Sequence, residues 1–267
     1  MIPSCSARIQ SCQQASLPIA MAIYLQISMQ LFPATSHAAL DHSTRDGASG
    51  MSISPSSSRL VSHYEQFLKD HDIEKFRQDV KARYTEATLG RLIQSSNMND
   101  RRASVLALGL IGEFGCNADV AKALHDSDST VRNLAENALW AIWFRADSVA
   151  NNARLETIRG LIGRQDYTSA LSQATELIKD APNFAEAYNQ RAITYFLMGR
   201  PEQSSADCQA VLERNPYHFG AIGGLGQCQL ILNQKAKALE TFRLGLKIQP
   251  HNLSFKQTVS ALESLDD

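Results

Sequence analysis

Three equally spaced prolines constrain the fold of this chain more than any other feature. The spacing from Pro182 to Pro216 equals that from Pro216 to Pro250, because 216 − 182 = 34 and 250 − 216 = 34. A fixed period of about 34 residues is typical of repeat proteins whose unit is a pair of helices. Proline ends each pair, since it lacks an N–H and clashes with the preceding helical turn. The spacing predicts stacked pairs that bury their apolar faces against one another.

The segment between Pro182 and Pro216 shows this pattern most clearly. Tyr188, Ala192 and Tyr195 recur at helical spacing and predict a first helix. Gly199 can adopt the left-handed conformation that ends a helix, and Pro201 suits the first turn of the next one. The segment is therefore expected to form two helices joined by a tight turn.

The same segment resembles the tetratricopeptide repeat. The resemblance rests on Tyr188, Asn189, Gln190, Arg191, Ala192, Tyr195, Gly199, Asp207, Leu212, Asn215 and Pro216. Small residues recur where helices cross, in the first helices at Ala192 and Gly226 and in the second helices at Ala170, Ser204 and Ala238. After Pro250 a single apolar stripe of Phe255, Val259 and Leu262 predicts a capping helix.

Two of the three units depart from the family pattern. The first unit has Arg154, Thr157 and Ile158 where the family prefers apolar, apolar and small residues, so its first helix is degenerate. The third unit has Gln229 in place of Tyr and Asn233 in place of Gly. These departures weaken the resemblance in the first and third units, but the assignment of three tetratricopeptide units stands.

A second resemblance precedes the repeats. Residues 99–144 resemble HEAT repeats of the short bacterial type, on Asp128, Val131, Arg132, Ala135, Ala138, Leu139 and Ile142, with an upstream copy at Arg101, Ala107, Leu108 and Ile111. In HEAT repeats, Asp128 and Arg132 would form ladders between successive turns. We expect an all-α α-solenoid superhelix, with HEAT-like hairpins followed by three tetratricopeptide units and a capping helix. No Pro or Gly interrupts residues 144–151, so the two halves are expected to be continuous.

The chain divides into three regions on this basis. Residues 1–58 form a leader and linker, residues 59–148 the HEAT-like region and residues 149–267 the tetratricopeptide region. An apolar run over 17–32 follows Arg8 and precedes small residues around Ala38, which is typical of a signal peptide cleaved near Ala38. Export, for example to a periplasm, is the first expectation. A cytoplasmic protein with a disordered leader, or one that starts near Met51, is the alternative.

Charge and cysteine content exclude several classes of function. Formal net charge is −1, with 12 basic and 13 acidic residues over 51–150 and 12 of each from 151 onward. No single-sign face is implied, which disfavours nucleic acid and anionic membrane as partners. The apolar run is too short and polar to span a membrane. Cys5 and Cys12 fall in the leader, and Cys116, Cys208 and Cys228 are expected to be buried thiols.

No catalytic, metal or cofactor motif stands out. None of the seven histidines pairs with a His or Cys at helical spacing, so neither a metal site nor a cofactor is predicted. The glycines Gly220, Gly223, Gly224 and Gly226 lie within an expected helix, where close packing explains them better than a phosphate loop. Trp140, Trp143 and Phe144 form an aromatic cluster expected to pack at the junction of the halves, with a ligand-stacking surface as the alternative.

The tetratricopeptide resemblance implies a concave groove lined by first helices. Its predicted lining residues are Leu155, Arg159 and Ile162 in the first unit, Glu186, Asn189, Ile193, Phe196 and Leu197 in the second, and Gln227, Leu230 and Ile231 in the third. Phe196 and Leu197 are expected to point partly out of the stack, and Tyr195 into the core. The lining lacks the Lys and Arg set with which chaperone-binding relatives clamp a carboxylate.

The predicted function follows from this groove. We expect a non-enzymatic protein-interaction module, a scaffold or adaptor that binds an apolar peptide or helix of another protein. A regulatory subunit of an enzyme complex is the alternative, and an enzyme hidden in the helical half is a third possibility without candidate residues.

Overall fold

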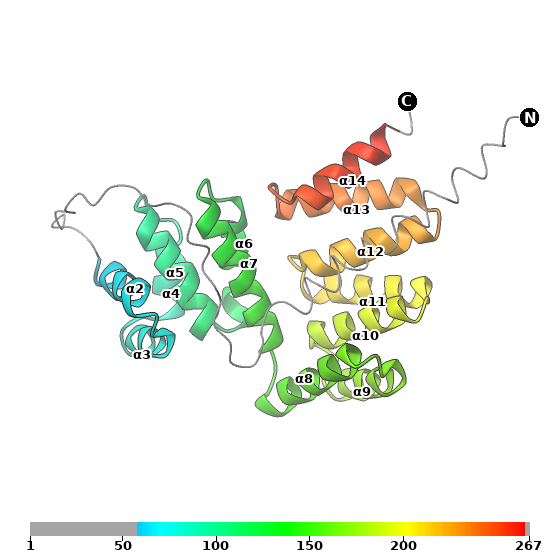
Figure 1. Ribbon diagram of the computed structural model, residues 1–267, viewed down its shortest axis with the longest axis horizontal. Coiled ribbons are helices and arrows are strands. Elements are labelled where there is room, and N and C mark those ends of the chain that lie inside the picture. Colours follow the sequence, from blue (N-terminus) through cyan, green and yellow to red (C-terminus); the bar gives the residue numbers. More distant parts are fainter. Residues whose placement is uncertain (1–57, 265–267) are drawn as a thin grey trace, which may run out of the picture. The chain divides into compact units, whose positions relative to one another are not determined.

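The computed structural model describes residues 58–264, and every regular element among them is a helix (Figure 1). The α-helices are α2 (Arg59–Asp70), α3 (Ile73–Arg83), α4 (Glu86–Leu92), α5 (Met98–Ile111), α6 (Asn117–Lys122), α7 (Ser129–Phe144), α8 (Val149–Gly163), α9 (Tyr167–Asp180), α10 (Ala185–Leu197), α11 (Pro201–Arg214), α12 (Phe219–Ile231), α13 (Lys235–Ile248) and α14 (Leu253–Glu263). Two short 3₁₀ helices, η1 (Phe114–Cys116) and η2 (Ala123–His125), flank α6. The predicted all-α class is confirmed.

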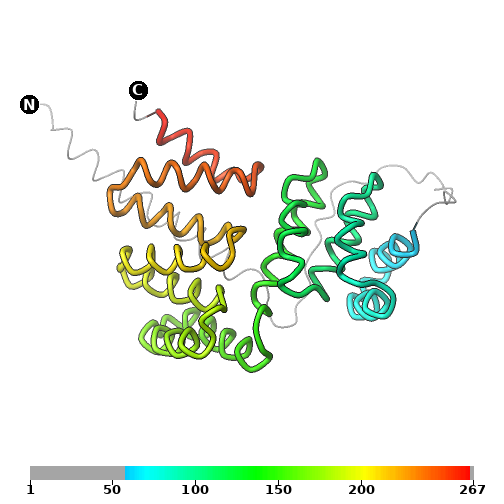
Figure 2. Tube along the Cα trace, turned by 180° about the vertical axis from the view of Figure 1, so that it is seen from behind, coloured from blue at the N-terminus to red at the C-terminus, as the bar shows by residue number. Residues whose placement is uncertain are grey.

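Helices α8 to α13 form three antiparallel pairs, and α14 covers the last pair (Figures 1 and 2). Each helix packs on the next along the chain, as expected for an α-solenoid. The tight turn within each pair places one residue at positive φ, and these residues are Gln165 (63°), Gly199 (70°) and Asn233 (57°). They follow the same period as the prolines, since 199 − 165 = 34 and 233 − 199 = 34. Gly199 thus has the predicted left-handed conformation, and Asn233 adopts the same one in its turn.

Small residues allow these helices to cross closely. Ala170, Ala192, Ser204 and Ala238 are all buried. A Cβ placed on Gly226 would lie 2.5 Å from Cζ of Phe242, so the absence of a side chain lets α12 approach α13. The predicted packing role of this glycine is confirmed.

The capping helix and the central pair also agree with expectation. Phe255, Val259 and Leu262 are the buried residues of α14. In the central pair, Nε and Nη2 of Arg191 each donate a hydrogen bond of 2.7 Å to the Asp207 carboxylate and so join α10 to α11. Tyr195, expected in the core, is only half-buried.

The preceding helices are joined by two ion pairs between the start of α5 and the turn before α7. Arg101 pairs with Asp126 at 2.6 Å, and Arg102 pairs with Asp128 at 2.7 Å. Arg132 donates to the backbone carbonyls of Asp126 and Ser127. Asp128 therefore has a structural role, as predicted, although its ionic partner is Arg102.

The chain turns sharply between α7 and α8, and α7 packs against the repeats beyond α8. It contacts α10 and the start of α12 in addition to α5 and α6. Trp140 and Trp143 are buried in this contact, which confirms their predicted packing role.

Cys116, Cys208 and Cys228 are free and buried, as expected. Burial raises the pKa of the Cys116 thiol to about 12 and that of Cys228 to about 11. Within residues 58–264, no helix is both long and apolar enough to span a bilayer. The predicted signal peptide, its cleavage near Ala38, the linker up to residue 57, Cys5 and Cys12 lie outside the described residues, so export stays a prediction.

Candidate functional site

Five of the predicted groove residues lie in the interior. Glu186, Asn189 and Ile193 are 1%, 1% and 2% exposed, so the expectation that they line an open groove is corrected. In the first unit, Leu155 and Ile162 are also buried, and the Arg159 guanidinium lies 4.2 Å from the centre of the Phe144 ring. Much of the side of the first helices that was expected to face a ligand is therefore covered.

A buried hydrogen-bond cluster occupies the start of α10. Oε1 of Glu186 accepts hydrogen bonds of 2.8 Å from the side-chain amides of Asn189 and Gln190. Its Oε2 lies 2.9 Å from Nε2 of His218. Since Nδ1 of His218 accepts the backbone N–H of Ala221, Nε2 carries the proton and donates to the carboxylate. The carboxylate is thus held by three N–H donors, which offsets the cost of burying it.

The chain's own helix α7 covers this cluster. Trp143 stacks on the His218 ring with centroids 4.3 Å apart, and Trp140 meets Phe219 edge-on at 5.4 Å. A Cβ on Gly220 would lie 2.7 Å from the Trp140 ring, so this glycine makes room for the indole.

Two asparagines extend the contact between the halves. Nε1 of Trp143 donates to Oδ1 of Asn117 at 2.8 Å, and Nδ2 of Asn117 donates to Oδ1 of Asn215 at 2.9 Å. Both asparagines are buried. The hydrogen bond from Asn117 to Asn215 therefore pairs two buried polar groups across the junction.

The remaining predicted lining residues lie in the last turns of α10 and α12. Phe196, Leu197, Gln227 and Leu230 are half-buried, and Ile231 is 48% exposed. We call these five residues the helix-end surface. Because α10 and α12 are both first helices of their pairs and contact each other, their ends lie on the same side of the stack. This surface is mostly apolar and is the part of the predicted groove that α7 leaves accessible.

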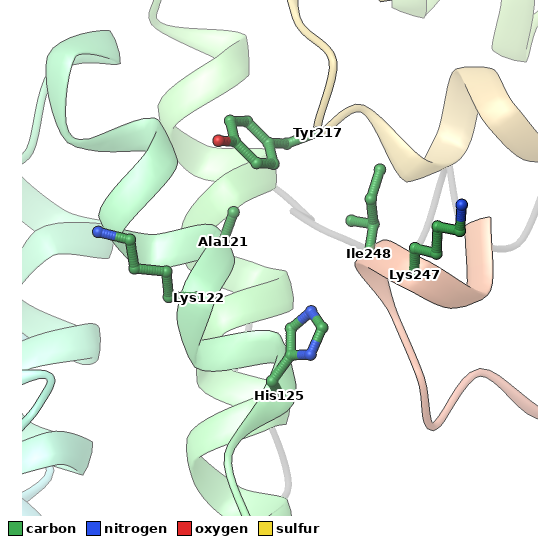
Figure 3. A pocket seen from close by; sticks show the side chains of 6 residues that line it. All are labelled: Ala121, Lys122, His125, Tyr217, Lys247 and Ile248. Carbon is green, nitrogen blue, oxygen red and sulfur yellow. The ribbon is translucent and has the colours of Figure 1, made fainter. Parts of the chain in front are cut away.

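A separate cleft was not anticipated from the sequence. A cavity of about 360 Å³ is lined by Ala121, Lys122, His125, Tyr217, Lys247 and Ile248 (Figure 3). Its lining comes from both halves of the chain, and His125 and Tyr217 are far apart in the sequence (217 − 125 = 92). No local sequence pattern could have brought these residues together. Within residues 58–264, no group of three or more His, Cys, Asp or Glu is arranged to hold a metal ion.

Comparison with known families identifies the central helical pair. Residues 185–218 match the family model of the tetratricopeptide repeat. The chain therefore carries a tetratricopeptide repeat at α10 and α11, where the sequence resemblance was clearest. No match extends this evidence to the HEAT-like resemblance of the preceding helices, which stays a prediction.

Several curated proteins are similar to the chain. Hsp70-Hsp90 organizing protein 1 of Glycine max is 30% identical over 136 residues, which are 51% of this chain and 23% of that protein. Hsp70-Hsp90 organizing protein 3 of Arabidopsis thaliana is 27% identical over 139 residues, 52% of this chain and 24% of that protein. A TPR repeat-containing protein of Rhizobium etli is 30% identical over 132 residues, 44% of this chain and 65% of that protein. The chain thus spans about a quarter of the length of the two plant relatives.

Solved structures show similarity at lower identity. The first TPR of Spaghetti (RPAP3), bound to an HSP90 peptide, is 18% identical with a TM-score of 0.43, over 45% of this chain and 97% of that one. The TPR2AB domain of yeast Sti1, in a pHSP90 complex, is 19% identical with a TM-score of 0.41, over 77% of this chain and 83% of that one.

Proposed function

We propose that this protein is a non-enzymatic protein-interaction module that binds a peptide or helix of another protein. The observation that carries the proposal is the tetratricopeptide match at residues 185–218, in a chain similar to proteins named Hsp70-Hsp90 organizing proteins. Stacked helical pairs present extended surfaces, and such surfaces are used for recognition. The partner is a protein, and its identity is left to experiment.

The helix-end surface is the proposed binding surface. It is the accessible remainder of the predicted groove, and apolar side chains gathered at a surface commonly mark an interaction site. Ile231 is its most exposed member, at 48%. An apolar residue of this kind can contribute much of the affinity for a partner.

Affinity purification of the tagged full-length chain from its native cell, followed by mass spectrometry, tests this function. A protein enriched with the wild-type chain should be depleted about tenfold or more by Ile231→Glu, because a buried charge would oppose binding. Leu244→Glu is the matched control, since Leu244 is 45% exposed and lies on α13, outside the helix-end surface. Both variants should fold, because both side chains are exposed.

The outcomes separate the candidate functions. One enzyme recovered in fixed ratio would favour the regulatory-subunit alternative over a general adaptor. The proposed surface would be contradicted if both variants reduced recovery of the partner protein equally, or if neither variant reduced it. Failure to enrich any protein would contradict the interaction function itself.

A further inference from the structure

The cleft between α6 and the ends of the second and third repeats has an apolar interior. Figure 3 shows Tyr217 and Ile248 facing Ala121 and His125 across the cavity. Lys122 and Lys247 flank it on opposite sides, with their aliphatic stems toward the cavity and their ammonium groups directed outward. At about 360 Å³, the cavity lies near the lower end of the range of about 300–1,000 Å³ that is usual for ligand sites. It can therefore accommodate one apolar side chain with charged groups around it.

A second cavity is lined in part by sequence neighbours of residues that line the first. It has a volume of about 150 Å³ and is lined by Leu124, Arg132, Asn133, Glu136, Gln249, His251 and Asn252. The two cavities share neighbouring residues on each wall, since Leu124 precedes His125 and Gln249 follows Ile248. We call the two cavities together the junction cleft.

The junction cleft carries an excess of basic groups. Among its lining residues, Lys122, His125, Arg132, Lys247 and His251 are basic, whereas Glu136 is the single acidic one. Lys122 is compensated by Asp119 at 2.7 Å, but no ion pair of Lys247 occurs within residues 58–264. Arg132 donates to backbone carbonyls, which carry no net charge.

Two lining groups have shifted pKa values, and only the shift of His251 reports positive charges nearby. Burial, followed by the positive charges of Arg132, Lys256 and His125, lowers the pKa of His251. Burial raises the pKa of Glu136, which disfavours its negative charge. The cations of the cleft are thus only partly neutralised by the chain itself.

We propose that the junction cleft binds a short acidic peptide segment of a partner protein. One apolar side chain of the peptide lies between Tyr217 and Ile248, and the carboxylates of the peptide lie near Lys247 and Arg132. Charge complementarity selects an acidic segment, and the apolar interior selects one that also contains an aliphatic or aromatic residue. The proposal rests on the proposed function in that the partner is a protein, but it concerns a different surface.

Fluorescence anisotropy with the full-length chain tests the proposal. The probe is a fluorescein-labelled hexapeptide of Asp and Glu around a single Leu. Lys247→Glu should weaken binding about tenfold, because it reverses a charge at the rim of the cavity. Lys237→Glu is the matched control on the same helix, since Lys237 is also exposed but does not line the cleft, and it should change binding by less than about twofold. Replacing the Leu of the peptide by Gly should also weaken binding.

Other results would overturn the proposal. Absence of binding, or equal loss with Lys247→Glu and Lys237→Glu, would show that the cleft does not recognise the peptide. Displacement by low concentrations of inorganic phosphate would indicate a simple anion site, and tighter binding of a single-stranded DNA oligonucleotide would indicate nucleic acid. Ile231→Glu should leave peptide binding unchanged, so failure of this proposal is distinguishable from failure of the proposed function.

Discussion

At the scale of single residues, Asp128 combines two structural roles. Its carboxylate accepts the backbone N–H of Val131 at 2.9 Å and so caps the start of α7. It also accepts hydrogen bonds of 2.9 and 2.7 Å from the Arg102 guanidinium, which joins α7 to α5. The hydrogen bond from Arg102 is the main reason why the pKa of Asp128 is lowered.

The variant Asp128→Asn separates these roles, because Asn caps helices as well as Asp does. Loss of the charge should reduce the free energy of unfolding at pH 7 by about 1–2 kcal/mol. A carboxylate whose pKa is lower in the folded state stabilises the fold above its unfolded pKa of about 3.9, and this contribution is lost as pH falls through the folded value. Urea unfolding at several pH values should therefore show the difference between wild type and variant shrinking below about pH 4. A constant difference would exclude this ionic contribution.

Residue-level packing also explains why the predicted groove lining was partly wrong. Helical spacing placed Glu186, Asn189 and Ile193 on one face of α10, and all three are buried. Spacing identifies a face but does not say what covers it. Tyr195 shows the same limit, because it is half-buried although it was expected in the core.

At the scale of the helix, α12 depends on glycines with different surroundings. A Cβ on Gly226 would meet the Phe242 ring at 2.5 Å, whereas a Cβ on Gly223 would lie 3.5 Å from Phe255, at ordinary contact distance. Both residues lie inside α12 with helical backbone conformation. The two glycines therefore allow a comparison, within one helix, of a site with no room for a methyl group and a site with room for one.

Alanine at these two positions should have opposite effects. Gly226→Ala should lower the free energy of unfolding by about 1–3 kcal/mol, because the methyl group overpacks the contact between α12 and α13. Gly223→Ala should raise it by about 0.5–1 kcal/mol, because Ala restricts the unfolded chain more than Gly does. Thermal unfolding followed by circular dichroism measures both. A stabilising Gly226→Ala would contradict the close helix contact.

At the scale of the whole described region, α7 links the two sets of helices. Its tryptophans pack on His218 and Phe219, and Asn117 donates to Asn215 across the same junction. The chain contains two tryptophans, Trp140 and Trp143. Tryptophan fluorescence therefore reports on this junction alone.

The junction should open together with the rest of the fold. In urea, fluorescence and far-ultraviolet circular dichroism should give the same midpoint, because buried contacts join the two halves into one cooperative unit. Trp143→Phe removes the hydrogen bond to Asn117 Oδ1 and should lower both midpoints equally. A fluorescence transition that precedes the loss of helix would show instead that α7 separates from the repeats while they remain folded.

The sequence by itself determined the local features of this protein. The regular spacing of the prolines, the turns at Gly199 and Pro201 and the stripe of α14 predicted where helices begin and end. Small residues such as Gly226 predicted close helix crossings. These features depend on neighbours within about two helical turns or on the next helix, so they can be inferred from spacing.

Only the tertiary structure decided which surfaces are free. Trp143 packs on His218, which lies far along the chain beyond two complete helical pairs, and this contact buries the expected groove lining of α10. The junction cleft likewise combines His125 with Tyr217 and Lys247. Such contacts depend on the direction in which α7 leaves its turn at residues 145–148, and helical periodicity does not encode that direction. The accessible helix-end surface and the basic cleft therefore follow from the three-dimensional packing of α7.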